Sequence, residues 1–222
     1  MTNSSDAEAD MIEIIELTKV LDENLSIYAN GPYSDPALEI ETWCTIQKQG
    51  YKVSRLSMGT QTGTHIDAPA HFAVDGATLE ALPLQAMIGQ YVWIDLDLVR
   101  QSRPSKPRFS HKKDEALLFL TSSGQNRREI VEEIFLALLK LPCRVWVIAH
   151  GFQVRGHEPL YFHQALAEAG KYLIEDVDEM TAMRVKAGGE LIALPLRLSG
   201  VSGAPCRVIV RQSVRQEKFA SE

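Results

Sequence analysis

Cysteine is scarce in this sequence of 222 residues, which contains only Cys44, Cys143 and Cys206 and no C-x-x-C pair. An odd number of cysteines without that spacing argues against a disulfide framework or a cysteine zinc site, and it favours a reducing compartment. Cys44 lies beside Trp43. That pairing is more typical of core filling than of a thiolate nucleophile.

Positive charge is also in short supply. The chain has 23 Lys and Arg against 29 Asp and Glu, which leaves a net charge of −6. A surface for nucleic acid or for an anionic membrane needs a basic footprint, so we expect neither partner. No run of residues approaches the ~18 to 20 apolar side chains that a membrane span requires.

The first residues lack the basic and apolar regions of a secretory signal. They are polar and acidic, so we expect a disordered acidic tail over residues 1–11 and a cytoplasmic protein. The rest of the composition, 45% hydrophobic and 23% charged, is ordinary for a globular protein. We find no repeat or linker that would divide residues 12–222, and we expect a single domain there.

Short apolar runs and helical spacing predict a mixed α/β domain. A segment rich in Asn, Gly, Ser and Pro, residues 22–36, is expected to be loop, and residues 59–72 fit no regular element. Helices are expected at residues 127–140 and at residues 161–169, the second ending at Gly170. Strands are expected at residues 12–17, 51–58, 91–96, 116–120, 144–149 and 171–175, with two more over residues 190–211.

Chemistry-bearing residues gather in the stretch Gly59–Phe72. His65 and Asp67 are two residues apart, so an extended backbone would present both on one face. His71 follows beyond Pro69, which prevents a helix from carrying the spacing. Imidazole and carboxylate together are usual ligands of Zn²⁺ or Mn²⁺. The alternative is a buried loop whose polar side chains satisfy one another by hydrogen bonding.

The run Thr64–His71 resembles the signature H-x-G-T-H-x-D-x-P-x-H of the cyclase family, which includes bacterial kynurenine formamidase and isatin hydrolase. Every fixed position is kept except the first, where Gln61 stands in place of histidine. Downstream, His163 precedes Glu175 by twelve residues, as it does in that family. The resemblance extends over residues 12–210. It implies a single α/β domain with a mixed sheet, of the kynurenine formamidase type, which resembles a swivelling β/β/α fold.

The resemblance also implies a centre of one or two divalent ions, zinc or manganese. His65 and Asp67 would bind a first ion, and Asp67 and Glu175 would bridge to a second ion that His163 also holds. His71 would correspond to the family's proton donor and acceptor. A homodimer or homotetramer is implied as well.

Three positions leave alternatives open. Gln61 could ligate through its amide oxygen, the site could hold only the ion near His163, or hydrolysis could have been lost. His150 stands where the family commonly has an aspartate, as a substitute ligand, a substrate contact or a satisfied polar residue. Tyr28 falls near an aromatic residue that contacts substrate in kynurenine formamidases.

These implications lead us to expect a metal-dependent hydrolase. It would cleave an acyl C–N or C–O bond of a small molecule, such as an amide, a cyclic amide or a lactone, with His71 as the proton shuttle. The departures at Gln61 and at Tyr28–Gly31 argue against kynurenine formamidase activity itself. The alternatives are a biosynthetic cyclase or dehydratase that uses the same centre as a Lewis acid, and a non-catalytic small-molecule binder.

Overall fold

The computed structural model describes residues 11–101, 109, 115–124 and 128–214. The expected tail over residues 1–11 therefore lies outside the described residues except for its last member. Seven strands form a closed barrel, in the order β14-β13-β7-β8-β10-β12-β6, and β6 pairs back with β14. The strands are β6 (His65–Asp67), β7 (Ile88–Asp95), β8 (Leu117–Thr121), β10 (Val145–Ile148), β12 (Tyr172–Glu175), β13 (Glu190–Pro195) and β14 (Gly203–Val214).

Four neighbouring barrel strands, β7, β8, β10 and β12, run parallel, and the remaining pairings are antiparallel. Parallel strands covered on both faces read as continuous apolar runs. In β8 and β10 every residue is buried. The mixed α/β class and the single domain are confirmed in this form, and the closure into a barrel is a feature that the sequence did not predict.

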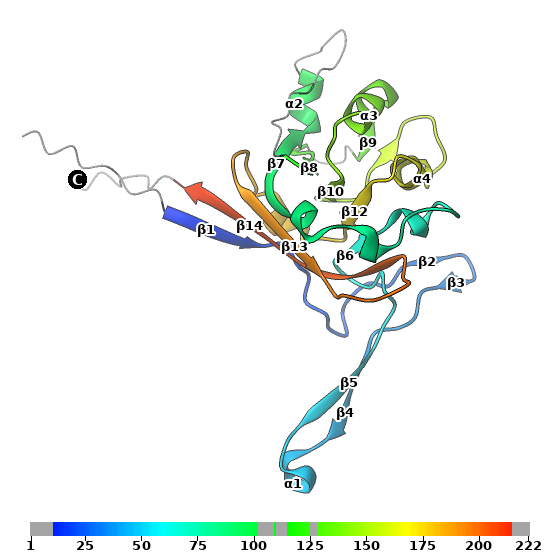
Figure 1. The fold of residues 1–222 in the computed structure, drawn as a ribbon, viewed down its shortest axis with the longest axis vertical. Coiled ribbons are helices and arrows are strands. Elements are labelled where there is room, and N and C mark those ends of the chain that lie inside the picture. The colour runs from blue at the N-terminus through cyan, green and yellow to red at the C-terminus, as the bar shows by residue number, and fades with distance from the viewer. Residues whose placement is uncertain (1–10, 102–108, 110–114, 125–127, 215–222) are drawn as a thin grey trace, which may run out of the picture.

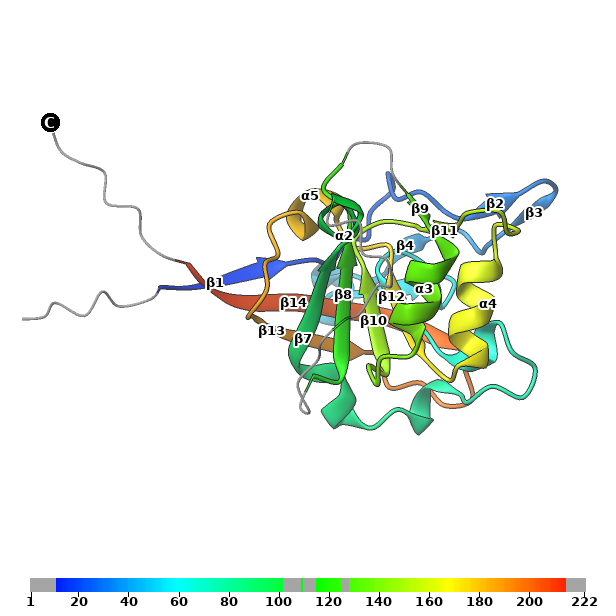
Figure 2. The same ribbon diagram turned by 90° about the horizontal axis from the view of Figure 1, so that it is seen from above.

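The two faces of these strands fill two separate cores. Phe119 and Val147 point into the barrel, where they pack with residues of the antiparallel strands. Trp146 and Leu118 point outward and pack against two helices, α3 (Glu132–Leu139) and α4 (Tyr161–Glu168). Figure 2 shows both helices beside β10 and β12.

The predicted helix at residues 161–169 is confirmed, and Gly170 follows it with a φ of 69°. The helix predicted from residue 127 begins only at residue 132, because Glu129–Ile130 (β9) pairs with Gln153–Val154 (β11). Apart from the helix in the N-terminal hairpin described below, the short helices of the described residues are α2 (Leu96–Gln101) and α5 (Glu179–Ala182). Three 3₁₀ turns lie at Pro69–His71, Leu79–Ala81 and Leu84–Met87. Within the described ranges, no helix is long and apolar enough to span a membrane.

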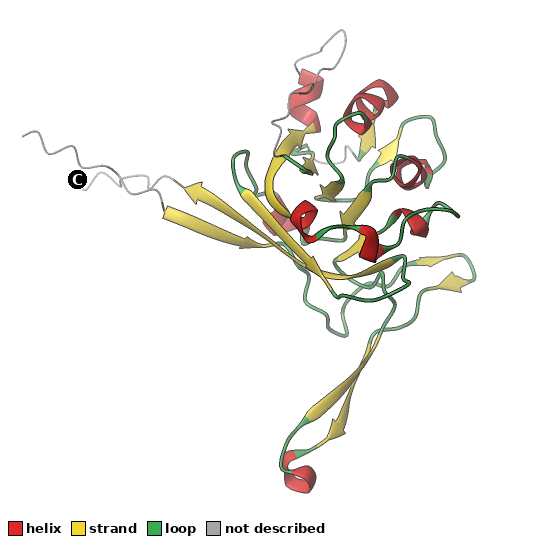
Figure 3. Ribbon diagram, viewed as in Figure 1, coloured by secondary structure: helices red, strands yellow, loops and turns green. Residues whose placement is uncertain are grey.

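Three elements lie outside the barrel at the N-terminal side. Strand β1 (Met11–Glu16), which agrees with the strand predicted at residues 12–17, pairs with β14. The expected loop at residues 22–36 contains a small hairpin of two strands of two residues each, β2 (Ala29–Asn30) and β3 (Tyr33–Ser34). A longer hairpin, β4 (Glu39–Cys44) with β5 (Val53–Ser57), projects from the body and carries α1 (Ile46–Gln49) at its tip (Figures 1 and 3). The prediction that Cys44 fills a core is wrong, because Cys44 lies half-buried on this hairpin, beside Trp43, which is 69% exposed.

Candidate metal centre

The centre is built on the three-residue strand β6, inside the stretch for which no regular element was expected. Strand β6 pairs with β12 on one side and β14 on the other, and its register sets His65 opposite Glu175. Cross-strand partners project from the same face of a sheet, and so do residues two apart along one strand. His65, Asp67 and Glu175 therefore share one face, with ligand atoms all within 4.8 Å of one another.

The ring of His65 is oriented by the backbone behind it. Its Nδ1 donates a hydrogen bond to the carbonyl oxygen of Gly63 at 2.7 Å, and the ring is buried. Such a bond fixes the tautomer of the neutral ring, in which the lone pair is on Nε2. Gly63 has a φ of 67°, and a Cβ there would lie 2.7 Å from Leu21 Cδ2, so the turn that supplies this carbonyl requires glycine. Nε2 of His65 lies 3.6 Å from Asp67 Oδ1 and 3.6 Å from Glu175 Oε1.

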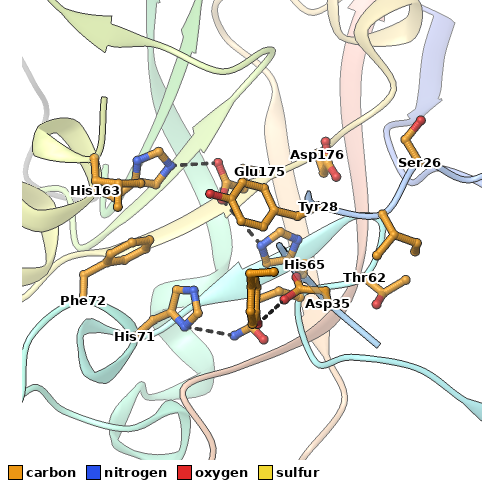
Figure 4. Close-up of a pocket in the computed structure, with 14 residues that line it drawn as sticks. Ser26, Tyr28, Asp35, Thr62, His65, His71, Phe72, His163, Glu175 and Asp176 are labelled. Atoms are coloured by element: carbon orange, nitrogen blue, oxygen red, sulfur yellow. Dashed lines mark hydrogen bonds and ion pairs between the residues drawn. The ribbon is translucent and has the colours of Figure 1, made fainter. Parts of the chain in front are cut away.

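Glu175 links two imidazoles. While its Oε1 faces His65, its Oε2 lies 3.2 Å from Nε2 of His163, which projects from the first turn of α4 (Figure 4). In this arrangement Glu175, rather than Asp67, stands between the two histidines. Nδ1 of His163 is buried and has no hydrogen-bond partner among the described residues.

The charged groups of the centre shift one another's pKa values. Burial alone would lower the pKa of His65, but hydrogen bonding and charge from Asp67 and Glu175 raise that pKa to about 10. Burial would raise the pKa of Glu175, yet the imidazoles of His163 and His65 hold it well below the usual carboxyl range. Burial would likewise lower the pKa of His163, and Glu175 raises it. The centre thus favours positive charge between its carboxylates.

This donor set fits a divalent cation. Imidazole nitrogen and carboxylate oxygen suit zinc and manganese. Asp67 Oδ2 is buried without a hydrogen-bond partner among the described residues. A buried carboxylate oxygen in that state is costly unless something binds it. The residues present therefore match the ligand chemistry that such an ion requires.

Gln61 occupies the position of the family's first histidine and presents its nitrogen to the centre. Its Oε1 accepts a hydrogen bond from the Thr60 hydroxyl at 2.6 Å, whereas Nε2 lies 3.4 Å from Asp67 Oδ1. Ligation of a metal through Oε1 would require the side-chain amide of Gln61 to flip, so that Oε1 and Nε2 exchange places. Strand β14 comes so close here that a Cβ on Gly203 would lie 2.5 Å from Gln61 Nε2 and 2.6 Å from the carbonyl oxygen of Ile66.

His71 stands at the rim of the centre, on the 3₁₀ turn that Pro69 begins. Its Nδ1 lies 3.2 Å from the hydroxyl of Ser202 and 3.4 Å from Gln61 Nε2. The ring of Phe72 packs edge-on against it, with centroids 4.5 Å apart, and lies 5.1 Å from the ring of His163. With Nδ1 engaged in this way, Nε2 is left for other partners.

A pocket of about 560 Å³ opens over these side chains (Figure 4). Its lining includes Gln61, His65, His71, His163 and Glu175, so the pocket collects most of the residues that the sequence analysis singled out. Tyr28 also lines it and is 55% exposed, with its ring 6.5 Å from the ring of Tyr33. The roles assigned to these residues remain predictions.

His150 is placed elsewhere. It follows β10, its ring lies 4.6 Å from the ring of Phe152, and burial lowers its pKa. It is not among the residues that line the pocket. The hypothesis that it contacts substrate therefore gains no support from this arrangement.

Two supporting residues were missed in the sequence. The hydroxyl of Thr64 donates to the carbonyl oxygen of Asp176 at 2.7 Å and accepts from the amide of Lys19 at 2.9 Å. Asp176 follows Glu175 directly and has a φ of 58°, a conformation rarely adopted by a residue with a Cβ. Thr64, as a fixed position of the signature, could have indicated these hydrogen bonds from the sequence. No sequence pattern around Asp176 predicts its part in them.

Comparison with known proteins agrees with this architecture. The Cyclase family model matches residues 15–132, more than half of the chain. Kynurenine formamidase of Bacillus cytotoxicus is 30% identical over 210 residues, covering 90% of this chain and 97% of the relative. The corresponding enzyme of Bacillus cereus is 27% identical over 210 residues, with the same coverage.

Solved structures show the same fold. Isatin hydrolase A from Labrenzia aggregata superposes with a TM-score of 0.71 at 19% identity, covering 91% of this chain and 94% of that one. A predicted metal-dependent hydrolase from Bacillus stearothermophilus superposes with a TM-score of 0.64 at 23% identity, covering 90% and 98%. The chain therefore belongs to the Cyclase family and is a distant homologue of kynurenine formamidase and isatin hydrolase.

Proposed function

We propose that this protein is a metal-dependent hydrolase that opens an acyl C–N or C–O bond of a small molecule, with an amide as the favoured substrate class. The observation that carries the proposal is the convergence of His65, Asp67 and Glu175, with ligand atoms within 4.8 Å of one another, beside a pocket of about 560 Å³. The names of the relatives, kynurenine formamidase and isatin hydrolase, support a hydrolase of this kind.

His65, Asp67 and Glu175 would hold the ion, zinc or manganese, and His163 lies close enough to Glu175 to join them. When bound, a divalent cation supplies Lewis acidity: it polarises an acyl carbonyl and makes water ionise near neutral pH. The carbonyl of Gly63 would keep the His65 ring in the ligating tautomer.

His71 would move the protons of the reaction. Its position on the pocket rim, with Nδ1 facing the Ser202 hydroxyl, leaves Nε2 to accept a proton from the attacking water. The same nitrogen would return that proton to the leaving nitrogen or oxygen, since an imidazole both accepts and donates near neutral pH. The group that leaves would then depart neutral.

The pocket walls would orient the substrate. Aromatic rings of Tyr28, Tyr33 and Phe72 line the space, together with Leu160, and these surfaces suit a flat apolar ring. The acyl bond would then face the floor, where His65 and Glu175 lie. Within this proposal the protein acts in the cytoplasm on a small molecule.

The test combines metal analysis with product analysis. Protein purified without chelator should carry a stoichiometric divalent ion. Incubation with cyclic amides should yield ring-opened products heavier by one water, and incubation with N-formyl anilines should release the aniline and formate. His71→Ala should lower kcat about 10²- to 10⁴-fold, the usual contribution of a general acid–base, and should leave the metal content unchanged. Full activity in metal-free protein would overturn the proposal.

A further inference from the structure

The carboxylates that line the pocket differ in whether a cation faces them. They are Asp35, Glu175 and Asp176, and the lining includes no Lys or Arg among the described residues. Glu175 faces two imidazoles, and Oδ1 of Asp176 lies 2.9 Å from Nζ of Lys19. Within the part of the chain that the structure describes, the charge of Asp35 is left without a compensating cation.

Asp35 is held in a fixed position at the end of the hairpin of β2 and β3. Its amide donates a hydrogen bond to the carbonyl oxygen of Tyr28 at 3.0 Å. Its Oδ1 accepts a hydrogen bond from the hydroxyl of Tyr33 at 2.6 Å, and this bond raises the pKa of Tyr33. Among the described residues, no group donates to the second oxygen, Oδ2. The carboxylate of this half-buried residue is therefore oriented in advance and has one oxygen to offer.

Two aromatic rings accompany this carboxylate in the pocket wall. Tyr28 and Tyr33 both line the pocket, and their ring centroids lie 6.5 Å apart with the planes tilted by 56°. The face of a tyrosine attracts a cation that lies within about 6 Å of the ring centroid. A cation held against these rings would also approach Asp35, because the hydroxyl of Tyr33 is bonded to its carboxylate. Aromatic rings beside an uncompensated carboxylate suit the recognition of an ammonium group.

The other side of the pocket offers an apolar surface. The ring of Phe72 packs against the rings of His71 and His163, with centroids 4.5 Å and 5.1 Å apart. Figure 4 shows Phe72 beside His71 on one side of the pocket and Asp35 on the other. A molecule that fills the pocket can therefore place an apolar group against Phe72 and a charged group at Asp35.

We propose that Asp35, with the rings of Tyr28 and Tyr33, selects substrates that carry a protonated amine and no carboxylate. The proposal rests on the proposed hydrolase function and narrows its substrate class to amides with a single positive charge. The ammonium group would bind at Asp35 while the acyl bond faces the metal centre. A substrate carboxylate in that position would meet the like charge of Asp35, and the described lining provides no Lys or Arg to receive it.

Matched formanilides test the proposal by steady-state kinetics at neutral pH. Their ring carries an aminoethyl group, which is cationic, a propyl group of the same length, which is neutral, or a carboxymethyl group, which is anionic. Wild-type kcat/KM should be about 10-fold or more higher for the cationic than for the neutral substrate, as expected of a charge-assisted contact, and lowest for the anionic one. A wild type that shows this order in neither the meta nor the para series would overturn the proposal.

Variants of Asp35 show whether this residue sets the preference. Asp35→Asn keeps the shape of the side chain, and the ratio of kcat/KM between the cationic and the neutral substrate should fall about 10-fold. Glu23→Gln is the matched control, because it removes an exposed carboxylate of the same loop outside the pocket lining, and it should keep the wild-type ratio. Asp35→Lys should reverse the order, so that the anionic substrate is favoured over the cationic one. If Asp35 only stabilised the hairpin, both Asp35 variants would lower all three values alike, and that result would overturn the proposal.

Calorimetric binding separates this proposal from the proposed function. The corresponding aminoethyl and propyl anilines bind without any reaction, and wild-type protein should bind the aminoethyl aniline about 10-fold or more tightly than the propyl aniline. Such a preference without hydrolysis of any formanilide would uphold the recognition of the cation and refute the hydrolase. Hydrolysis of the formanilides together with equal binding of the two anilines would refute the recognition of the cation and leave the hydrolase standing.

Discussion

Replacing Glu175 by Gln tests the candidate centre with little change of shape. In wild type, a ligand that binds only the folded state at 100 times its Kd adds about 2.7 kcal/mol to the free energy of unfolding. For a chain of this size, that corresponds to a rise in Tm of roughly 5–11 °C. We therefore expect zinc or manganese to raise the Tm of metal-free protein by that amount.

In Glu175→Gln the amide keeps one oxygen but loses the charge that links His65 and His163. If affinity falls about 100-fold, the same free metal concentration equals Kd and adds only ~0.4 kcal/mol, or a Tm rise of about 1–2 °C. Glu132→Gln is the matched control. Its carboxylate lies 3.0 Å from Nε2 of His157, an imidazole contact like that of Glu175 but outside the pocket.

Differential scanning fluorimetry of metal-free protein, titrated with zinc and separately with manganese, measures these shifts. Because each variant is compared with itself before and after metal addition, a change in its own stability does not enter the result. Equal metal-induced shifts in wild type and Glu175→Gln would refute the centre. A loss of the shift in Glu132→Gln would show that metal acts elsewhere on the surface.

Three further predictions concern Gln61, Gly203 and Asp97. Gln61→His should raise zinc affinity about 10- to 100-fold, measured by competition with a chromophoric chelator, because imidazole is a better zinc donor than an amide; unchanged affinity would contradict this. Gly203→Ala should lower the free energy of unfolding by about 1–3 kcal/mol in urea titrations, since its Cβ would clash with the backbone of β6, whereas Gly151→Ala, with open space around it, should not. Burial would raise the pKa of Asp97, but hydrogen bonds from Ser122 and other donors lower it. The carboxylate of Asp97 therefore binds a proton less readily in the folded state than in the unfolded state. The stability that the ionised carboxylate contributes is complete above pH 3.8, the ordinary pKa of an aspartate, and is lost as the pH falls below that value. Asp97→Asn should be less stable at neutral pH by about 1–3 kcal/mol and should lose less on acidification; parallel pH curves would refute this.

The central strands could be predicted because their sequences leave little choice. Residues 145–148 are four consecutive large apolar residues, which fits a strand buried on both faces. The helix at 161–169 was predictable for a similar reason, from its apolar spacing and the glycine that follows. The start of the preceding helix was not, because β9 is a two-residue strand that exists only through its pairing with β11.

The candidate site was predictable in its residue types and not in its arrangement. The spacing of His65 and Asp67 already placed them on one face, as the extended conformation of β6 requires. Their relation to Glu175 depends on a cross-strand register between segments about 110 residues apart, which no local pattern encodes. The same limit explains His150, whose position after β10 gave no indication that it would be absent from the pocket lining.

Strand β6 also links the fold to the chemistry. The barrel closes only through this strand, since it pairs with β12 and β14 at once, and two of the three candidate ligands lie on it. A cation held by His65, Asp67 and Glu175 would therefore tie β6 to β12 with bonds additional to the ladder. Binding free energy would then count as folding free energy at the seam of the barrel. Amide hydrogens of β6 and its neighbours should consequently gain more protection from exchange on metal addition than those of β8, which lies across the barrel.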